Sequence, residues 1–319
     1  MRAVRYAQYG GPEVLSVEQV PIPLPGPTQV RIRVAATSVN AADVHVRSGS
    51  MRLLTGRKFP KGTGIDAVGE VEATGADVSS VSVGQRVWAV TGDGRAFGAR
   101  LGSAAESALF EQAHVTAAPA DVTDLGAAAT VMPATMAVRT LREAARLLAG
   151  ERVLVRGATG AVGSAVVQLA NALGAHVIAL TNAANTDLAQ SLGASEVFDY
   201  ATTRPADIRL VDVIVDTVGT GLMNWRRRLA PGGRMVTLAA TPGALASVAA
   251  GRVISLAGGP RMSTFIAQPP NHCIAEAARH VEEKFIRPVI DSVYPFEQAT
   301  AAHRAFESGG LRGRVLLTP

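Results

Sequence analysis

A glycine-rich turn between a strand-like and a helix-like segment constrains the fold of this chain more than any other feature. Residues 152–156 are rich in β-branched side chains, and residues 163–173 carry apolar side chains at helical spacing, with Gly174 as the predicted C-cap. Strand-like segments follow at 176–180, 196–198, 211–216 and 233–238, and helix-like segments at 186–192 and 222–229. This alternation predicts an α/β domain with a doubly wound parallel sheet.

The turn itself, residues 157–163, approximates the dinucleotide fingerprint, in which three spaced glycines link a strand to a helix. Ala158 occupies the first glycine position, Gly157 precedes it, and Gly160 and Gly163 fill the other two. Gly160 leaves room for a pyrophosphate and Gly163 lets the helix approach the strand, while the helix N-terminus attracts phosphate. The turn therefore predicts a dinucleotide site. The alternative is a tight strand-to-helix turn that holds no ligand.

The end of the next strand indicates which dinucleotide binds. An acidic residue there would hold the ribose 2′-hydroxyl of NAD, but Leu180-Thr181-Asn182-Ala183-Ala184-Asn185 contains no acid. Thr181 and Asn182 can donate hydrogen bonds to a 2′-phosphate, so the sequence favours NADP (NADPH), although no lysine or arginine supplies a positive clamp. The alternative is that these polar residues cap the following helix.

The first 120 residues have a different texture, with short alternating runs separated by turn residues. Residues 30–34, 67–72 and 86–90 are strand-like, and four prolines between 21 and 27 exclude helix, so this part predicts a mostly β barrel or sandwich. Residues 124–148 are largely helical in pattern, with Pro133 as the candidate break. Helices over 270–284 and 299–308 and strands over 289–293 and 314–317 form a tail that either extends the parallel sheet or returns to the first domain.

Bulk composition excludes several classes of protein. A chain of 319 residues, 48% hydrophobic and 18% charged, predicts two soluble globular domains. No apolar run is long enough to cross a bilayer, and the N-terminus lacks the pattern of a signal peptide, so we expect a cytoplasmic protein without a membrane partner. Cys273 stands alone, which rules out an intrachain disulfide. The net charge of +5 is scattered, and no nucleic-acid partner is expected.

Taken together, these segments resemble the zinc-independent quinone oxidoreductases of the medium-chain dehydrogenase/reductase superfamily. The resemblance runs nearly from end to end and rests on the order and spacing of short motifs rather than on any one of them. Besides the glycine turn, the motifs are Gly10-Gly11-Pro12-Glu13-Val14-Leu15, Ser38-Val39-Asn40-Ala41-Ala42-Asp43, Gly64-Ile65-Asp66-Ala67-Val68-Gly69, Val83-Gly84-Gln85-Arg86-Val87, Leu192-Gly193-Ala194, Asp216-Thr217-Val218-Gly219, Pro231-Gly232-Gly233 and Gly313-Arg314-Val315-Leu316.

The resemblance implies a domain plan and an activity. A GroES-like catalytic domain comprises residues 1–120 and the returning tail 267–319, and a Rossmann domain comprises residues 121–266. The family uses NADPH to reduce quinones, enones or other activated double bonds, so a small-molecule substrate is expected. Many members form homodimers or homotetramers through the Rossmann domain.

The resemblance also assigns site residues. Asn40 and His45 are the predicted catalytic residues; the alternatives are that Asn40 satisfies backbone groups of a turn and that His45 is a half-exposed histidine on a helical turn. Asp43 is expected to fix local backbone rather than act as an acid, and Asp66 to play a supporting role. Zinc-dependent relatives carry a cysteine at the position of Asn40 and a His-Glu pair at Ile65-Asp66, so no metal is expected. The predicted cofactor contacts are Asn40, Thr135, Gly157, Gly160, Ala161, Val162, Gly163, Thr181, Asn182, Tyr200, Leu238, Ala239, Phe265, Ile266 and Arg312, with Arg314 as an alternative to Arg312.

Two further functions remain open from the sequence. One is an enoyl-thioester or biosynthetic alkene reductase on the same scaffold, because aromatic residues make up only 4% of the chain and a quinone-stacking surface would be thin. The other is a dinucleotide-binding protein without turnover that has a structural, sensory or RNA-binding role.

Overall fold

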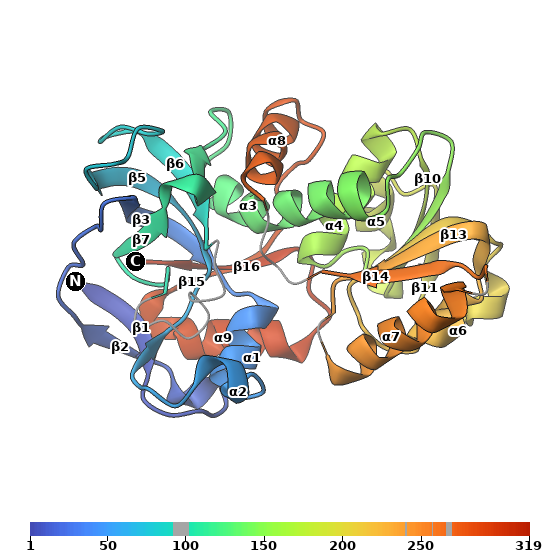
Figure 1. Ribbon diagram of the computed structural model, residues 1–319, viewed down its shortest axis with the longest axis horizontal. Helices are drawn as coiled ribbons and strands as arrows, with labels where there is room; N and C mark the ends of the chain where they lie inside the picture. Colours follow the sequence, from blue (N-terminus) through green and yellow to red (C-terminus); the bar gives the residue numbers. More distant parts are fainter. Residues whose placement is uncertain (92–101, 240, 257, 266–269) are drawn as a thin grey trace. The chain divides into compact units, whose positions relative to one another are not determined.

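A computed structural model describes residues 1–91, 102–239, 241–256, 258–265 and 270–319, which divide into two compact units (Figure 1). Unit 1 comprises Met1–Met132, Gln268–Glu283 and Pro288–Pro319, and unit 2 comprises Pro133–Ala267 and Lys284–Arg287. The expected domain limits were 120 and 266. The first division instead falls inside helix α3 (Asp124–Val138), because this helix runs without interruption from one unit into the other.

The described residues of unit 2 form a six-stranded sheet in which every pair of neighbours is parallel. Its strands are β9 (Arg152–Arg156), β10 (His176–Thr181), β11 (Glu196–Asp199), β12 (Val211–Asp216), β13 (Leu229–Thr237) and β14 (Arg261–Thr264). Their order in space is β11-β10-β9-β12-β13-β14. Counted from β9, this is the 3-2-1-4-5-6 order of dinucleotide-binding sheets, so the order reverses between β9 and β12. The predicted doubly wound parallel sheet is confirmed.

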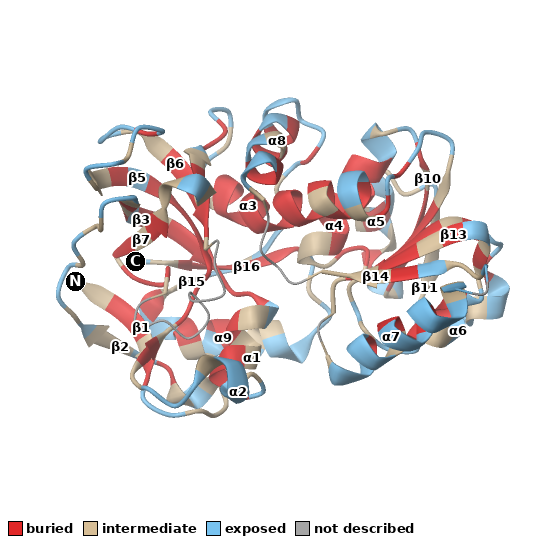
Figure 2. Ribbon diagram, viewed as in Figure 1, coloured by how far each residue is buried: buried red, intermediate tan, exposed pale blue. Residues whose placement is uncertain are grey.

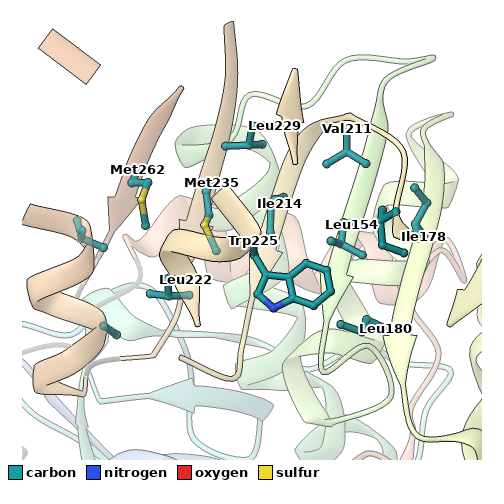
Figure 3. Close-up of a cluster of buried hydrophobic side chains, with 13 residues drawn as sticks. Leu154, Ile178, Leu180, Val211, Ile214, Leu222, Trp225, Leu229, Met235 and Met262 are labelled. Atoms are coloured by element: carbon teal, nitrogen blue, oxygen red, sulfur yellow. The ribbon is translucent and has the colours of Figure 1, made fainter. Parts of the chain in front are cut away.

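Helices cover both faces of this sheet. Helices α4 (Ala161–Ala172) and α5 (Thr186–Ser191) lie on one face, and α6 (Leu222–Arg226) and α7 (Pro242–Leu256) lie on the other (Figure 1). Figure 3 shows the core on the α6 and α7 side, where Ile214, Trp225 and Met235 belong to one buried cluster. Because both faces are covered, the strands are apolar without alternation, as the sequence of β9 and β12 shows.

The turn between β9 and α4 depends on two glycines. Gly157 has a φ of +75°, a left-handed conformation that side chains disfavour. A Cβ added to Gly163 would lie 2.0 Å from the carbonyl oxygen of Gly157, so α4 approaches the turn as closely as a backbone can. The sequence-based role of Gly163, to let the helix pack against the strand, is therefore confirmed.

Three segments of unit 2 differ from expectation. Helix α3 continues through Pro133 and passes into a π-helix at Arg139–Ala144, because residues 126–138 are all buried and this packing outweighs one missing backbone hydrogen bond (Figure 2). Helix α6 ends at Arg226, since β13 already begins at Leu229. Helix α7 and strand β14 were not predicted. Their packing uses Gly251, where an added Cβ would lie 2.3 Å from the sulfur of Met262.

Unit 1 is mainly β-structure. The described part of its larger sheet has seven strands in the order β15-β16-β3-β5-β6-β8, with β7 also paired to β3, and a smaller sheet has the order β2-β1-β4. The strands are β1 (Arg2–Tyr6), β2 (Ser16–Gln19), β3 (Gln29–Ser38), β4 (Lys61–Gly62), β5 (Asp66–Thr74), β6 (Arg86–Val90), β7 (Ser107–Glu111), β8 (Val115–Ala117), β15 (Ile290–Pro295) and β16 (Arg314–Thr318). Its described α-helices include α1 (Ala41–Arg47), α2 (Arg52–Thr55), α8 (Asn271–Glu282), α9 (Ala299–Ser308) and the first part of α3.

The C-terminal tail returns to this unit. Strand β16 pairs antiparallel with β3, with Leu316 opposite Ser38, and pairs parallel with β15. Val315 and Leu317 are buried in one cluster with Val4 and Phe296. The first of the two alternatives for the tail, an extension of the parallel sheet, is therefore wrong. Within the described ranges, no helix has the length and apolar character needed to cross a membrane.

Replacing Gly163 by alanine tests the packing of the turn. We expect Gly163→Ala to lower the free energy of unfolding by about 3 kcal/mol, because the new methyl group meets backbone rather than a movable side chain. The control is Gly243→Ala in α7, where nothing lies within 4 Å of the added Cβ and helix propensity favours alanine. Urea denaturation measures both variants, and equal stability of the two would contradict the packing.

Candidate functional site

The carboxyl ends of the unit 2 strands bring most of the predicted cofactor residues to one edge of the sheet. Because all six strands are parallel, the segments that follow them emerge at this edge. The predicted residues that follow or end a strand are Gly157, Gly160, Ala161, Val162 and Gly163 after β9, Thr181 and Asn182 at β10, Tyr200 after β11, Leu238 and Ala239 after β13, and Phe265 after β14. Ile266, also predicted, lies outside the described residues.

The glycine turn is built as an open cradle. The backbone N–H groups of Gly157 and Ala158 donate to the carbonyl oxygen of Leu180, which ties the turn to β10. Gly160 is the N-cap of α4, and a Cβ placed on it would meet only the carbonyl oxygen of Gly157, at 3.4 Å. The first-turn N–H groups of a helix have no acceptor within the helix. Space beside Gly160 and unpaired helical donors together suit an anionic group.

A polar cluster lies beside the turn at the end of β10. The hydroxyl groups of Thr159 and Thr181 are 2.6 Å apart, and Nδ2 of Asn185 donates to Thr159 Oγ1 at 3.1 Å. Asn182 follows Thr181, and its side-chain oxygen is buried without a hydrogen-bond partner among the described residues. The Thr181 hydroxyl is thus held by Thr159, whereas Asn182 keeps hydrogen-bonding capacity for a ligand.

A buried ion pair at the reversal of strand order escaped the sequence analysis. Arg156 ends β9 and Asp216 ends β12, and their Nη1 and Oδ1 atoms are 2.5 Å apart. The other Asp216 oxygen accepts from the backbone N–H of Gly219 and the hydroxyl of Thr237, both at 2.8 Å. Burial lowers the pKa of Arg156, and the charge of Asp216 opposes that shift. Nε of Arg156 is buried without a partner among the described residues.

A signal for this pair was present in the sequence. Each charged residue comes directly after three apolar residues of a buried strand, Val153-Leu154-Val155 and Val213-Ile214-Val215. Charged residues are almost never fully buried unless they are paired. Two opposite charges at the same end of neighbouring strands therefore predict an ion pair once the strand order is known.

The other predicted cofactor residues of unit 2 differ from one another in burial and in their contacts. Thr135 is completely buried within α3. Tyr200 is 60% exposed, and its backbone N–H donates to Thr181. The backbone N–H of Leu238 donates to Asp216, and that of Ala239 donates to the Thr237 hydroxyl. Phe265 lies under the Arg139 guanidinium, 4.3 Å from its ring centroid. Their cofactor contacts stay predictions.

In unit 1, Asn40 belongs to a buried cluster centred on Asp66. Nη2 of Arg314 lies 2.9 Å from Asp66 Oδ2 and also donates to Ser38 Oγ and Asn40 Oδ1. Ser38 donates to Asp66 through both its backbone N–H and its hydroxyl. Nδ2 of Asn40 donates to the Ser38 carbonyl and to Asp66. These contacts fix the Asn40 amide in one orientation, and they place Arg314 inside the unit rather than toward solvent.

Asp43 forms the start of α1. Its carboxylate accepts from the backbone N–H of Asn40 at 2.9 Å and from that of Gly64 at 2.7 Å, which joins α1 to the segment before β5. Burial raises the pKa of Asp43 to about 6, and the two backbone hydrogen bonds oppose this shift. The predicted supporting role of Asp43, to hold local backbone, is confirmed.

The remaining predicted residues of unit 1 are more accessible. His45 lies on α1 and is half-buried, and its imidazole makes no hydrogen bond to any residue that the structure describes. Arg312 is exposed, and its backbone N–H donates to Asp291. His45 is therefore available for a ligand, whereas the Asn40 amide is already engaged.

The donor set around Asn40 does not suit zinc. Catalytic zinc takes three protein ligands, usually from His, Cys and carboxylates. Asn40 and Ile65 supply none of these, and Asp66 is neutralised by Arg314. In the described N-terminal part of unit 1, residues 1–91 and 102–132, no three such side chains lie close enough together to hold an ion.

Comparison with known proteins places the chain in a class and then in a family. The family model of the alcohol dehydrogenase GroES-like domain matches residues 26–120, and the family model of zinc-binding dehydrogenases matches residues 192–317. The protein is therefore an oxidoreductase of the medium-chain dehydrogenase/reductase superfamily. It is 32% identical to the quinone oxidoreductase of Sus scrofa over 336 residues, which cover 99% of this chain and 97% of the relative. The chain belongs to the quinone oxidoreductase family, which confirms the resemblance.

Solved structures agree with this assignment. The quinone oxidoreductase of Coxiella burnetii superposes with a TM-score of 0.91 at 25% identity, over 100% of this chain and 99% of that one. A mycobacterial protein solved in complex with NADPH superposes with a TM-score of 0.83 at 25% identity, over the full length of both chains. The open glycine cradle and the unpaired atoms of Arg156 and Asn182 fit a nicotinamide dinucleotide at the carboxyl edge of the unit 2 sheet.

Removal of the Arg314 charge tests the Asp66 cluster. We expect Arg314→Gln to lower the free energy of unfolding by about 3–5 kcal/mol, because it leaves a buried carboxylate without a counterion. Arg304→Gln on the exposed face of α9 is the control and should change it by less than about 0.5 kcal/mol. Asp66→Asn combined with Arg314→Gln should recover part of the loss. A loss below about 1 kcal/mol for Arg314→Gln alone would contradict the role of Arg314 in holding this cluster together.

The raised pKa of Asp43 predicts a pH dependence. The folded state holds the Asp43 proton more tightly than the unfolded state, so this residue contributes stability at low pH that is lost as pH rises from about 4 to about 6. Relative to Asp43→Asn, the wild-type protein should lose roughly 3 kcal/mol across this window and nothing further above pH 7. Urea denaturation at several pH values measures the difference, and parallel curves would show that the pKa is not raised.

Proposed function

We propose that this protein is an NADPH-dependent, zinc-independent reductase of quinones or of double bonds conjugated to a carbonyl. The observation that carries the proposal is the open glycine turn at the reversal of strand order, in a chain that aligns from end to end with quinone oxidoreductases. A bound nicotinamide dinucleotide supplies the hydride, and the protein supplies binding, orientation and charge stabilisation.

The residues of unit 2 orient the cofactor. The helix N-terminus at Gly160 and the adjacent amides receive the pyrophosphate. Asp216 holds the segments that follow β12 and β13 through Gly219 and Thr237, and this fixes the backbone at Leu238 and Ala239. Arg156 is the buried counterion of the Asp216 carboxylate.

Residues of unit 1 stabilise and protonate the molecule that accepts the hydride. Hydride addition to a conjugated carbonyl places negative charge on its oxygen, which needs a hydrogen-bond donor, and a proton must follow. We assign proton donation to His45, whose imidazole makes no hydrogen bond to any residue that the structure describes. The Asn40 amide is already engaged by Ser38, Asp66 and Arg314, so we assign Asn40 a positioning role as the N-cap of α1, the helix that carries His45.

The activity is tested by steady-state oxidation of NADPH with a panel of quinones, enones and enoyl thioesters. The proposal expects turnover with quinones or enones and a large loss of kcat in His45→Phe at unchanged NADPH affinity. Turnover with thioesters alone would favour the biosynthetic reductase, and NADPH binding without oxidation of any acceptor would favour the non-catalytic protein.

Preference for NADPH over NADH rests on the end of β10. Thr181 and Asn182 present neutral polar groups there, so the end of β10 itself places no negative charge beside a 2′-phosphate. An Asn182 amide rotated by half a turn presents its NH₂ group as a donor. We expect Asn182→Asp to weaken NADPH binding at least about tenfold and to spare NADH, because it adds a negative charge beside the 2′-phosphate. Cofactor fluorescence measures both affinities, Asn182→Ser is the neutral control, and equal loss for both cofactors would refute this placement.

We also propose that copies of the chain associate through unit 2. Strand β14 ends the described sheet, and α7 beside it exposes the apolar side chains of Leu245, Val253, Ile254 and Leu256. An exposed apolar face next to a strand edge favours association. Light scattering should give the mass of a dimer or tetramer, and a monomer at micromolar concentration would contradict the proposal.

A further inference from the structure

A polar cavity lies within unit 2, at the opposite edge of the sheet from the glycine turn. It has a volume of about 620 Å³, and its charged lining includes Arg146, Arg234, Arg252 and Arg261. Arg261 begins β14, and the neighbouring segment 143–151 directly precedes β9. Because parallel strands all begin at one edge and end at the other, this cavity is separate from the predicted dinucleotide site.

One of the four arginines, Arg234, already has hydrogen-bond partners within the protein for its guanidinium group. The Arg234 guanidinium forms two hydrogen bonds with the Glu151 carboxylate, at 2.6 and 2.7 Å, and also donates to the carbonyl oxygens of Ala145 and Arg146. It thereby holds Arg146, which has a left-handed φ of +49°, at the rim of the cavity. Arg234 thus holds together the segments that line the cavity, and Glu151 compensates the charge of the Arg234 guanidinium.

The other three arginines carry uncompensated charge. Arg146, Arg252 and Arg261 form no ion pair or hydrogen bond through their guanidinium groups with any residue in the described part of the chain, and all three are exposed. Glu143, the other acidic residue of the lining, pairs with Arg139. Arg261 is moreover the register partner of Arg234 on the neighbouring strand. Three cations around one hollow indicate an anionic ligand.

The size and charge of the cavity narrow the ligand class. Its volume lies within the range of about 300–1,000 Å³ typical of small-molecule sites, so it is larger than one inorganic ion requires. Arginine forks match phosphate oxygens, and each phosphate group carries about −1.5 to −2 charges at neutral pH. Three guanidinium groups therefore balance two phosphate groups. We propose that this cavity, lined by Arg146, Arg252 and Arg261, binds a small organic molecule that carries two phosphate groups.

Calorimetric titration with inorganic pyrophosphate tests the proposal. We expect pyrophosphate to bind the wild-type protein in the presence of saturating NADPH, which occupies the glycine turn, because the two sites lie at opposite edges of the sheet. Arg252→Gln and Arg261→Gln should each weaken binding about tenfold, the effect of losing one charge-assisted contact. Arg209→Gln, which removes an exposed arginine elsewhere in unit 2, should change it less than about twofold.

A second readout separates ligand binding from a structural role. Arg261 is exposed and its guanidinium contacts no described residue, so the pyrophosphate-free Arg261→Gln variant should melt close to the wild-type temperature. It should also lose the rise in melting temperature that pyrophosphate gives the wild-type protein. If Arg261→Gln fails to fold, Arg252→Gln alone still decides the proposal by its pyrophosphate affinity.

The proposed site would be overturned if pyrophosphate does not bind in the millimolar range, if all variants bind it with equal affinity, or if adding NADPH abolishes its binding. A change of oligomeric mass in Arg252→Gln or Arg261→Gln, without pyrophosphate binding to the wild type, would assign these arginines to an interface with a second copy.

Discussion

The approach of helix α4 to the end of strand β9 is the constraint on which the proposed chemistry of unit 2 depends. Gly157 turns the chain in a conformation that side chains disfavour, and Gly163 places the helix backbone against the Gly157 carbonyl. Only this close approach aims the helix N-terminus at the point where the strand order reverses. Gly160, in the same turn, is under no such packing constraint, since an added Cβ would stay clear of the protein. The space at Gly160 is therefore left for a ligand.

Buried ion pairs support the predicted site in both units. Arg156 with Asp216 joins two neighbouring strands of unit 2, and Arg314 with Asp66 joins the C-terminal strand of unit 1 to β5. Such pairs contribute little net stability, since desolvation offsets their attraction, but they penalise any arrangement that separates the partners. Each pair holds backbone or side chains predicted to meet the cofactor or the acceptor, which are Leu238 and Ala239 in one case and Asn40 in the other.

The fold was largely predictable from local patterns, whereas the environment of the site was not. Strand β9, the glycine turn and helix α9 follow from β-branched runs, glycine spacing and helical periodicity, which are local properties. Helix α7 was missed because its small residues and two glycines look unhelical until Met262 packs against Gly251. The engagement of the Asn40 amide was missed because Arg314 is 274 residues away in the chain. Partners that distant become neighbours only once β16 has paired with β3.

The affinity of a Gly160→Val variant for NADPH tests the central claim most directly. The added side chain meets no protein atom closer than 3.4 Å through its Cβ, so the variant should keep the wild-type melting temperature. Gly243→Val, equally unhindered in α7, is the matched control and should bind NADPH as the wild type does. The account predicts that Gly160→Val weakens NADPH binding at least about tenfold by occupying the pyrophosphate position. Unchanged NADPH affinity in a folded Gly160→Val protein would contradict it.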